Sequence, residues 1–273
     1  MPRRPYAYFR PETLDEALRL MQKPNHVLLA GGTKLLAGDV EAAVVDLQGL
    51  GLTKIEIAEG SLVVGAMSRL AELEGYLQSE MLPKGPVDLL RRALRFAGPN
   101  TYRNAATLGG TIAARIVDSE LLAALLALNA KLRLRQPAPV TVSLENYLAA
   151  PNDGLILEVI LPWNPGQGGS ERVARTPADT PIVSVTGWQP EGEEIRLAAT
   201  GIDDQLPAVR LKAASESLKN GLTPERMEEA ASLAGKAAHH AGDFRGDYAY
   251  RAEMASVLTR RLLKKWPPGV DAI

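Results

Sequence analysis

Two stretches of the chain share one short pattern, in which apolar residues lead into two adjacent glycines and a threonine. The first runs from Leu28 to Leu36 and the second from Ala106 to Ala113. Adjacent glycines allow positive φ angles and a close approach of the backbone to a ligand, and successive free N–H groups in such a turn form an anion-binding concavity. Either stretch alone is more simply an ordinary turn at the end of a strand. Their repetition in one chain indicates a single diphosphate held from two sides.

The rest of the chain offers few side chains for covalent or acid–base catalysis. It has no cysteine, which excludes disulfides, thiolate catalysis and cysteine-ligated metal sites held by this chain alone. Its three histidines, His26, His239 and His240, form no pattern typical of a metal pair or a catalytic triad. The glycine motifs G-x-G-x-x-G and G-x-x-x-x-G-K-[ST] are both missing. Two backbone cradles without catalytic groups favour a bound cofactor that supplies the chemistry.

A flavin dinucleotide fits this combination, with its pyrophosphate between the two glycine stretches. Lys34 can add a positive charge to the anion site, although an exposed lysine in a loop is at least as simple an interpretation. Glu120 can accept a hydrogen bond from a ribose hydroxyl; otherwise it is a carboxylate near a helix start, where negative charge is favourable. We expect valine at Gly32 or Gly110 to abolish flavin retention, because a Cβ would block the close approach of the backbone.

Composition and charge exclude several other classes of protein. The chain has 273 residues, of which 46% are hydrophobic and 23% charged, as is usual for a soluble globular protein. A formal net charge of −1 and an aromatic content of 5% argue against binding nucleic acid. The longest apolar stretch, Leu121 to Ala130, is too short to span a bilayer, and the N-terminus lacks the apolar segment of a secretory signal. We therefore expect a cytoplasmic protein.

The length of the chain and a glycine-rich stretch predict two domains, and hydrophobic periodicity predicts the helices and strands in each. The first covers residues 1–165, with subdomains of about 1–53 and 54–165, and the second covers residues 170–273. The glycine-rich stretch from Asn164 to Ser170 is predicted as the linker between them. The elements expected in the first domain are helices over 14–21, 68–77, 87–96 and 121–128, parallel strands over 27–30 and 42–47, a hairpin of 54–59 with 61–66, and strands over 131–135, 140–144 and 155–161.

The second domain is predicted as an antiparallel sheet followed by a helical layer. Three strands are expected over 172–175, 182–188 and 194–200, and three helices over 209–219, 224–241 and 248–266. Thr223, Pro224 and Glu225 mark the start of the middle helix, because threonine caps a helix well and proline suits its first position.

Several short motifs occur in a fixed order along the chain. They are Tyr8 to Pro11 with Thr13 to Leu18, Ala30 to Leu36, Val64 to Leu73, Arg103 to Ala113, and Asp243 to Gly246 with Tyr250, Arg251 and Val257 to Arg261. In this order and spacing they resemble the FAD-binding (medium) subunit of molybdenum hydroxylases, the family of the xanthine dehydrogenases and aerobic carbon monoxide dehydrogenases. The resemblance runs over nearly the whole chain.

The resemblance implies the α+β fold of the vanillyl-alcohol-oxidase-type flavoproteins. An FAD-binding domain, made of a small β-α-β subdomain and a mixed or antiparallel subdomain, precedes a C-terminal domain with a three-stranded antiparallel sheet and a helical layer. The implied role is that of an oxidoreductase subunit in a hetero-oligomer. A molybdopterin-binding large subunit oxidises the substrate, a small subunit with two-iron two-sulfur clusters relays electrons, and FAD in this subunit passes them to NAD or another acceptor.

The resemblance also implies which residues hold FAD, and it implies no catalytic residue and no metal ligand in this chain. The residues expected to bind FAD are Leu29, Ala30, Gly31, Gly32, Thr33, Lys34, Leu35, Leu36, Thr107, Leu108, Gly109, Gly110, Thr111, Glu120, Leu157 and Arg172.

Two departures from the family pattern leave alternatives open. After the second glycine pair the family commonly has asparagine and then a Ser-Pro-x-x-Asp turn, whereas this chain has Thr111 and the turn from Arg115 to Glu120. One alternative is a degenerate subunit of the same fold, with a structural or interaction role and weak or no FAD binding. Another is a stand-alone FAD oxidoreductase of this fold, which ranks last because nothing here resembles a substrate-side acid or base.

Overall fold

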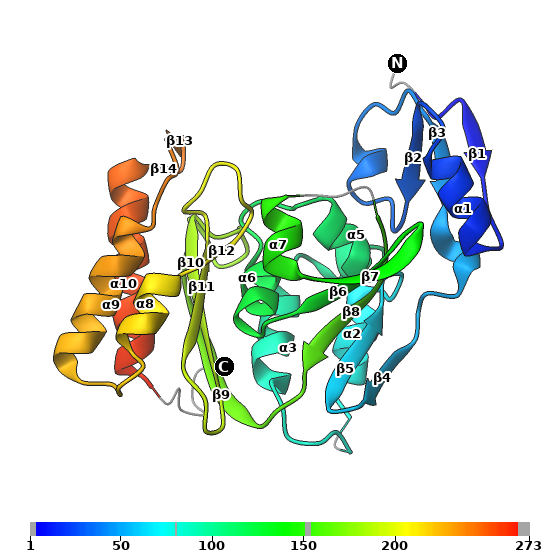
Figure 1. Cartoon of the computed structure of the whole chain (residues 1–273). Helices are drawn as coiled ribbons and strands as arrows, with labels where there is room; N and C mark the ends of the chain where they lie inside the picture. Colours follow the sequence, from blue (N-terminus) through cyan, green and yellow to red (C-terminus); the bar gives the residue numbers. More distant parts are fainter. Residues whose placement is uncertain (1–3, 80, 151–153, 267–273) are drawn as a thin grey trace.

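The computed structural model describes residues 4–79, 81–150 and 154–266, which form three parts packed side by side (Figure 1). The N-terminal lobe is a small parallel sheet with strand order β1–β3–β2, comprising Ala7–Phe9, Ala43–Asp46 and His26–Leu29. Helix α1 (Leu14–Met21) and the 3₁₀ turns η1 (Leu35–Ala37) and η2 (Leu47–Leu50) complete it. The parallel pairing expected for the strands on either side of the first glycine stretch is confirmed.

Helix α1 begins where the sequence predicts, because Thr13 caps it. The Thr13 hydroxyl accepts a hydrogen bond from the N–H of Glu16 at 3.2 Å, and the Glu16 carboxylate accepts from the N–H of Glu12 at 3.2 Å. Such a cap satisfies N–H groups that a helix start leaves without partners. The helix then buries Ala17, Leu18 and Leu20.

The middle lobe contains a five-stranded antiparallel sheet and a group of helices. Its strand order is β4–β5–β8–β6–β7, comprising Ile55–Ala58, Ser61–Gly65, Leu155–Pro162, Lys131–Gln136 and Ala138–Ser143. The helices are α2 (Leu70–Tyr76), α3 (Val87–Phe96), α4 (Asn100–Arg103), α5 (Leu108–Ala113), α6 (Glu120–Ala127) and α7 (Leu144–Ala149). The expected hairpin of β4 and β5 and the bounds of α3 agree with the sequence analysis.

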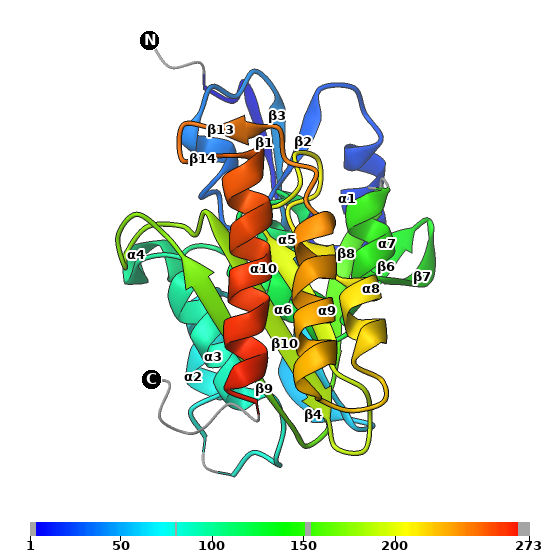
Figure 2. The same ribbon diagram turned by 90° about the vertical axis from the view of Figure 1, so that its left-hand side faces the viewer.

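The C-terminal lobe is a four-stranded antiparallel sheet covered by helices. Its strand order is β12–β11–β10–β9, comprising Val209–Arg210, Arg196–Thr200, Val183–Pro190 and Gly166–Val173. Helices α8 (Lys212–Ser217), α9 (Pro224–Lys236) and α10 (Tyr248–Lys264) lie along its outer face, as Figure 2 shows, and a short hairpin of β13 (Gly242–Asp243) and β14 (Gly246–Asp247) precedes α10. No helix in the described part of the chain is long and apolar enough to cross a membrane.

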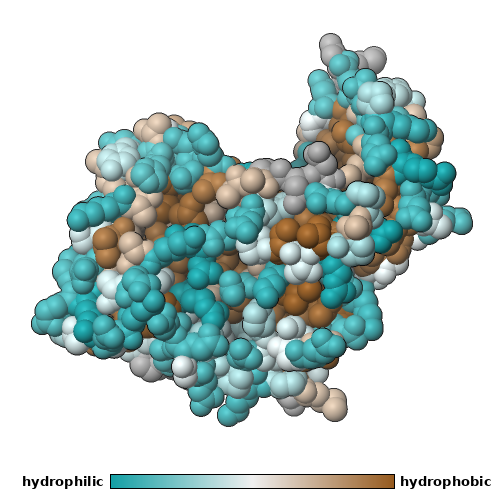
Figure 3. All heavy atoms as spheres, viewed as in Figure 1, coloured by the Kyte–Doolittle hydropathy of each residue, from teal (hydrophilic) through white to brown (hydrophobic). Residues whose placement is uncertain are grey.

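Helix α6 joins the middle and C-terminal lobes. All eight of its residues are buried. One hydrophobic cluster contains the α6 leucines together with Trp188 of β10 and Ala198 of β11, while the other face of that sheet packs against α9 and α10 in a second cluster. The C-terminal sheet is therefore covered on both faces. Figure 3 shows the N-terminal lobe projecting from this larger body.

Three expectations about local structure are wrong. Residues from Gly166 onward are not a linker but the strand β9, which pairs with β10 along its whole length. Residues 209 and 210 form strand β12 before α8 starts, so the sheet has four strands rather than three. The helix expected from residue 68 begins at Leu70 instead, because the Ser68 hydroxyl donates to the carbonyl of Thr53 at 3.0 Å and does not cap the helix. The division of the chain into domains at residues 165 and 170 stays a prediction.

Candidate functional site

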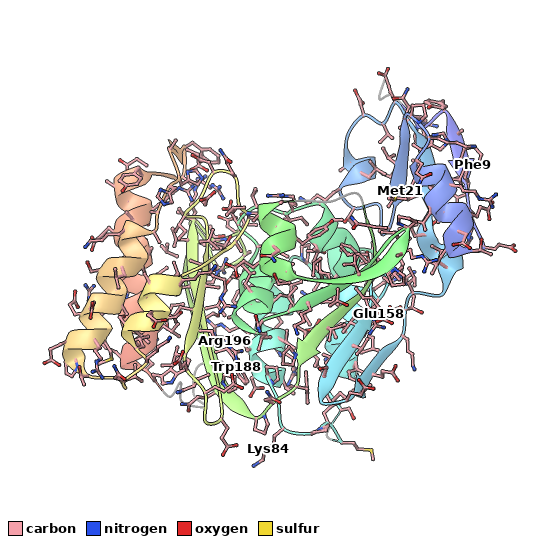
Figure 4. The ribbon with its side chains drawn as sticks, viewed as in Figure 1. Phe9, Met21, Lys84, Glu158, Trp188 and Arg196 are labelled. Atoms are coloured by element: carbon pink, nitrogen blue, oxygen red, sulfur yellow. The ribbon has the colours of Figure 1, made fainter. Side chains whose placement is uncertain are left out.

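A large cavity lies between the N-terminal lobe and the middle lobe. Its volume is about 1120 Å³, which is at the upper end of the range typical of small-molecule sites. Among its lining residues are Met21 of α1, labelled in Figure 4 at the edge of the N-terminal lobe, and Tyr147 of α7. Both glycine stretches also line it.

The first glycine stretch follows β2 and offers free amide groups. Gly32 has φ = +74°, a conformation that glycine adopts without strain, and its carbonyl accepts from the N–H of Leu36 at 2.9 Å as η1 begins. Within the described residues, no backbone carbonyl accepts from the N–H groups of Gly32, Thr33 and Lys34. This stretch therefore fits the expected anion cradle.

The second glycine stretch is not a loop, contrary to the expectation from sequence. Thr107 caps α5, and its hydroxyl accepts from the N–H of Gly110 at 3.1 Å. The N–H groups of Leu108 and Gly109 donate to the carbonyls of Ser68 and Ala66 at 3.0 and 2.8 Å. These amides are engaged within the protein, so the second stretch contributes close backbone packing rather than free donors.

The two stretches meet face to face. A Cβ built on Gly31 would lie 2.0 Å from the carbonyl oxygen of Ala105, and one on Gly110 would lie 3.2 Å from the Cβ of Ala30. A Cβ on Gly109 would lie 2.6 Å from the Cβ of Ala66. Glycine at these positions allows β2 and α5 to approach closely across the lobe boundary. The two motifs, distant in sequence, thus form one wall of the cavity.

Most residues expected at the site line this cavity, and six do not. The lining residues are Ala30, Gly31, Gly32, Thr33, Lys34, Leu35, Thr107, Gly109, Gly110 and Thr111. Leu29 and Leu108 are buried beneath the wall, and Leu36 is 52% exposed outside it. Leu157 packs in the cluster that contains Met67. Glu120 and Arg172 lie at the boundary of the middle and C-terminal lobes.

Sequence analysis missed part of the cavity. Most of the missed residues lie outside the two glycine stretches, although Leu28 and Ala113 are end residues of those stretches. The full set is Leu18, Met21, Gln22, Leu28, Leu47, Ala66, Met67, Tyr102, Ala113, Ala114, Ile116, Arg135, Gln136, Pro137, Tyr147, Gly154, Leu155 and Ile156. The α1 residues belong to a helix that the sequence predicts, but helical periodicity does not distinguish a face buried in a core from a face that lines a ligand cavity.

Comparison with known proteins identifies the family. Residues 4–164 match the family described as the FAD binding domain in molybdopterin dehydrogenase, and residues 182–266 match the CO dehydrogenase flavoprotein C-terminal domain. The chain belongs to this family of FAD-binding domains. Its cofactor is FAD, as expected, and since dehydrogenases are oxidoreductases, the chain is the FAD-binding part of an oxidoreductase.

Individual relatives match along almost the whole chain. The uncharacterized protein YgfM of Escherichia coli K12 is 32% identical over 260 residues, covering 93% of this chain and 94% of that protein. The glyceraldehyde dehydrogenase medium chain of Sulfolobus acidocaldarius is 26% identical, covering 95% and 98%. A structure of carbon monoxide dehydrogenase from Hydrogenophaga pseudoflava has the same fold, with a TM-score of 0.86 and 24% identity over 97% of this chain and 98% of that one. The fold class expected from sequence is confirmed.

The cavity fits FAD by two observations. One wall is formed where the backbones of the two glycine stretches meet so closely that a Cβ would collide. Free backbone N–H groups and the Lys34 side chain lie on one side of it. The volume of the cavity accommodates an elongated dinucleotide. No group of three or more histidine, cysteine, aspartate or glutamate side chains suited to a metal ion occurs in the described residues.

Glu120 forms a buried ion pair with Arg172 outside the cavity. Its Oε2 lies 3.2 Å from Nε of Arg172, whose guanidinium lies 4.3 Å from the centroid of the Phe96 ring. Neither carboxylate oxygen accepts a hydrogen bond among the described residues. Burial raises the pKa of Glu120 to about 7, although the positive charges of Arg172 and Arg92 oppose the shift. The role of Glu120 at a ribose hydroxyl stays a prediction.

We expect Glu120→Gln to flatten the pH dependence of stability. An acid whose pKa is raised on folding, here from 4.5 to about 7, stabilises the fold at low pH, and this contribution is lost as the pH rises. The wild type should lose about 2 kcal/mol relative to the variant between roughly pH 5 and pH 8. Urea unfolding at the two pH values measures the difference. Glu56→Gln, which changes an exposed surface pair with Lys54, is the control. An equal change in the free energy of unfolding with pH for wild type and Glu120→Gln would contradict the prediction.

Proposed function

We propose that the chain is the electron-transfer subunit of a multi-subunit molybdenum hydroxylase. In this assignment a partner with two-iron two-sulfur clusters delivers electrons to FAD, and NAD or another acceptor removes them. The observation that carries the proposal is the cavity, which offers a dinucleotide cradle but no cysteine for an iron–sulfur cluster of its own. The absence of cysteine supports a route in which the iron–sulfur clusters belong to another chain.

The chain's own residues hold and shield the cofactor. The free N–H groups of Gly32, Thr33 and Lys34 fit a diphosphate, since backbone donors and a nearby cation both favour an anion. FAD, when bound, supplies the electron-accepting and electron-donating chemistry. The apolar residues Leu18, Met21 and Ile156 line the cavity and offer it apolar surface.

The names of the relatives support the assignment to a larger assembly. The relative from Sulfolobus acidocaldarius is named as the medium chain of glyceraldehyde dehydrogenase. The relative from Paenarthrobacter nicotinovorans is named as the medium subunit of nicotine 6-hydroxylase. Because this chain covers 95% or more of the length of both, we propose the same position for it, beside a molybdopterin-binding large subunit and an iron–sulfur small subunit. A cytoplasmic location remains the expectation from sequence.

Purified protein tests the proposal directly. We expect it to carry the visible absorption of an oxidised flavin, with about one FAD per chain, and to show rapid bleaching when a reduced two-iron two-sulfur partner is added anaerobically. Protein that holds FAD but is not reduced by such a partner would contradict the electron-transfer role.

The degenerate subunit without FAD is the second candidate. The turn from Arg115 to Glu120 favours it, because Arg115 and Asp118 both have positive φ angles (45° and 57°) in place of the family's proline turn. A colourless protein that fails to take up added FAD, yet still assembles with the large and small subunits, would support this candidate over the first.

A further inference from the structure

The turn from Arg115 to Ser119 connects the cofactor cavity to the C-terminal lobe. It follows α5 directly, and Ile116 within it lines the cavity. Two of its residues, Arg115 and Asp118, adopt the left-handed backbone conformation, which costs roughly 1 kcal/mol or more for a residue with a Cβ. Such a conformation persists only where surrounding contacts determine it, so the contacts of this turn show what holds the cavity wall.

The C-terminal lobe supplies those contacts at both ends of the turn. Nη2 of Arg115 donates to the carbonyl of Gln205 at 3.2 Å. Asp118, only 8% exposed, has Oδ2 at 2.6 Å from Nη2 of Arg245 in the β13–β14 hairpin. The cavity residue Ile116 therefore lies between two anchors that reach into the other lobe.

Arg245 is itself held in a fixed position. Its Nε and Nη2 both donate to Oδ2 of Asp243, at 2.9 and 2.8 Å, and a planar guanidinium paired in this way has little rotational freedom. Asp243 also accepts from Arg251 at 2.7 Å, and Arg251 is fully buried. Burial alone would raise the pKa of Asp243, but hydrogen bonds from Arg245 and Arg251 outweigh it and hold the pKa well below its usual range.

We propose that Arg245 is a positioning residue for FAD: through Asp118 it fixes the strained turn that carries the Ile116 side of the cavity. The C-terminal lobe thus takes part in cofactor binding without lining the cofactor site. This inference rests on the proposed binding of FAD in the cavity.

The matched variants are Asp118→Asn and Arg245→Met. Asparagine keeps the size of aspartate and tolerates the left-handed conformation, so Asp118→Asn removes the charge with little change in backbone strain. We expect the dissociation constant for FAD to rise about tenfold in each variant, which corresponds to about 1.4 kcal/mol. The double variant should bind FAD as tightly as the single variant with the lower affinity, because both changes remove the same interaction.

Two further variants separate positioning from general stability. Arg245→Lys keeps the charge but loses the paired geometry, so it should restore part of the affinity. Arg260→Met breaks another two-bond pair of the C-terminal lobe, with Glu228, far in sequence from the turn, and should leave the dissociation constant for FAD unchanged. The visible circular dichroism of bound flavin should change in Asp118→Asn and stay as in wild type in Arg260→Met.

The outcomes are distinguishable. Titration of apoprotein with FAD, followed by flavin fluorescence, gives each dissociation constant. Wild-type affinity and wild-type flavin dichroism in Asp118→Asn would overturn the inference while leaving the proposed function intact. Additive losses in the double variant would also overturn it. A wild-type protein that binds no FAD would overturn both the inference and the proposed function. If Arg245→Met does not fold, Asp118→Asn and Arg245→Lys still decide the question.

Discussion

Alanine in place of Gly31 is expected to weaken FAD binding strongly. The new Cβ would lie 2.0 Å from the carbonyl oxygen of Ala105 and 3.1 Å from the α-carbon of Ala106. Both neighbours are backbone atoms, so no side chain can rotate away and the N-terminal lobe must move apart from α5. Overpacking of this kind costs 1–3 kcal/mol or more, so the dissociation constant for FAD should rise by roughly 100-fold.

Gly38 provides a matched control in the same connection between β2 and β3. A Cβ on Gly38 meets nothing within 4 Å, and its φ of −120° is open to any residue. Gly38→Ala should therefore bind FAD as tightly as wild type. The affinity of Gly32→Ala for FAD should lie between those of Gly31→Ala and Gly38→Ala. Its cost comes mainly from the positive φ of +74° rather than from a collision with backbone atoms. Equilibrium titration of the three apoproteins measures the series, and tight binding by Gly31→Ala would show that the glycine contact is not the cofactor cradle.

This series also shows what the sequence could and could not predict about the cradle. The pattern of two glycines before a polar pair correctly indicated a close approach of the backbone. It could not say which glycine makes the closest approach, because the partner is Ala105, more than seventy residues away. Sequence reasoning therefore chose Gly32 and Gly110 for substitution, whereas the structure places the tightest contact at Gly31.

The strand β9 shows how tertiary contacts override local signals. Its glycines indicated a linker, since glycine is depleted in strands. A Cβ on Gly168 would lie 2.5 Å from the ring of Trp188, and one on Gly166 would lie 2.7 Å from the same ring. The glycines leave room for the indole of Trp188, which is labelled in Figure 4 and belongs to the neighbouring strand β10. Nothing near Gly166 in the sequence reveals that requirement.

Elements whose start and periodicity are both marked in the local sequence were predicted more accurately. Helix α3 begins directly after Pro86 and repeats its apolar residues at helical spacing, and its bounds, Val87–Phe96, agree with expectation. Glu120 shows the opposite case. The helix start there was recognised, but its ion pair with Arg172 joins two lobes, and long-range pairing of this kind leaves no periodic signal in one sequence.

Arg251→Met is expected to destabilise the C-terminal lobe by about 3–5 kcal/mol, as is usual when one partner of a buried charged network is removed. The side chain is fully buried. It donates to the carbonyls of Ile182 and Gly201, each at 2.7 Å, and to that of Gly246 at 3.1 Å. Methionine fills a similar volume but donates to none of them, so buried carbonyls lose their partner.

Arg260→Met is the control for this effect, because the Arg260–Glu228 pair is partly exposed, with side chains 30% and 60% accessible. Exposed pairs contribute about 0–1 kcal/mol. Urea unfolding followed by circular dichroism compares the two variants, and hydrogen exchange in β10 and β11 locates the change. Equal urea midpoints for Arg251→Met and Arg260→Met would mean that the carbonyls at the start of β10 and the end of β11 find other donors. A large difference would identify Arg251 as the residue that fixes the β13–β14 hairpin to the sheet, and with it the position from which Arg245 reaches Asp118.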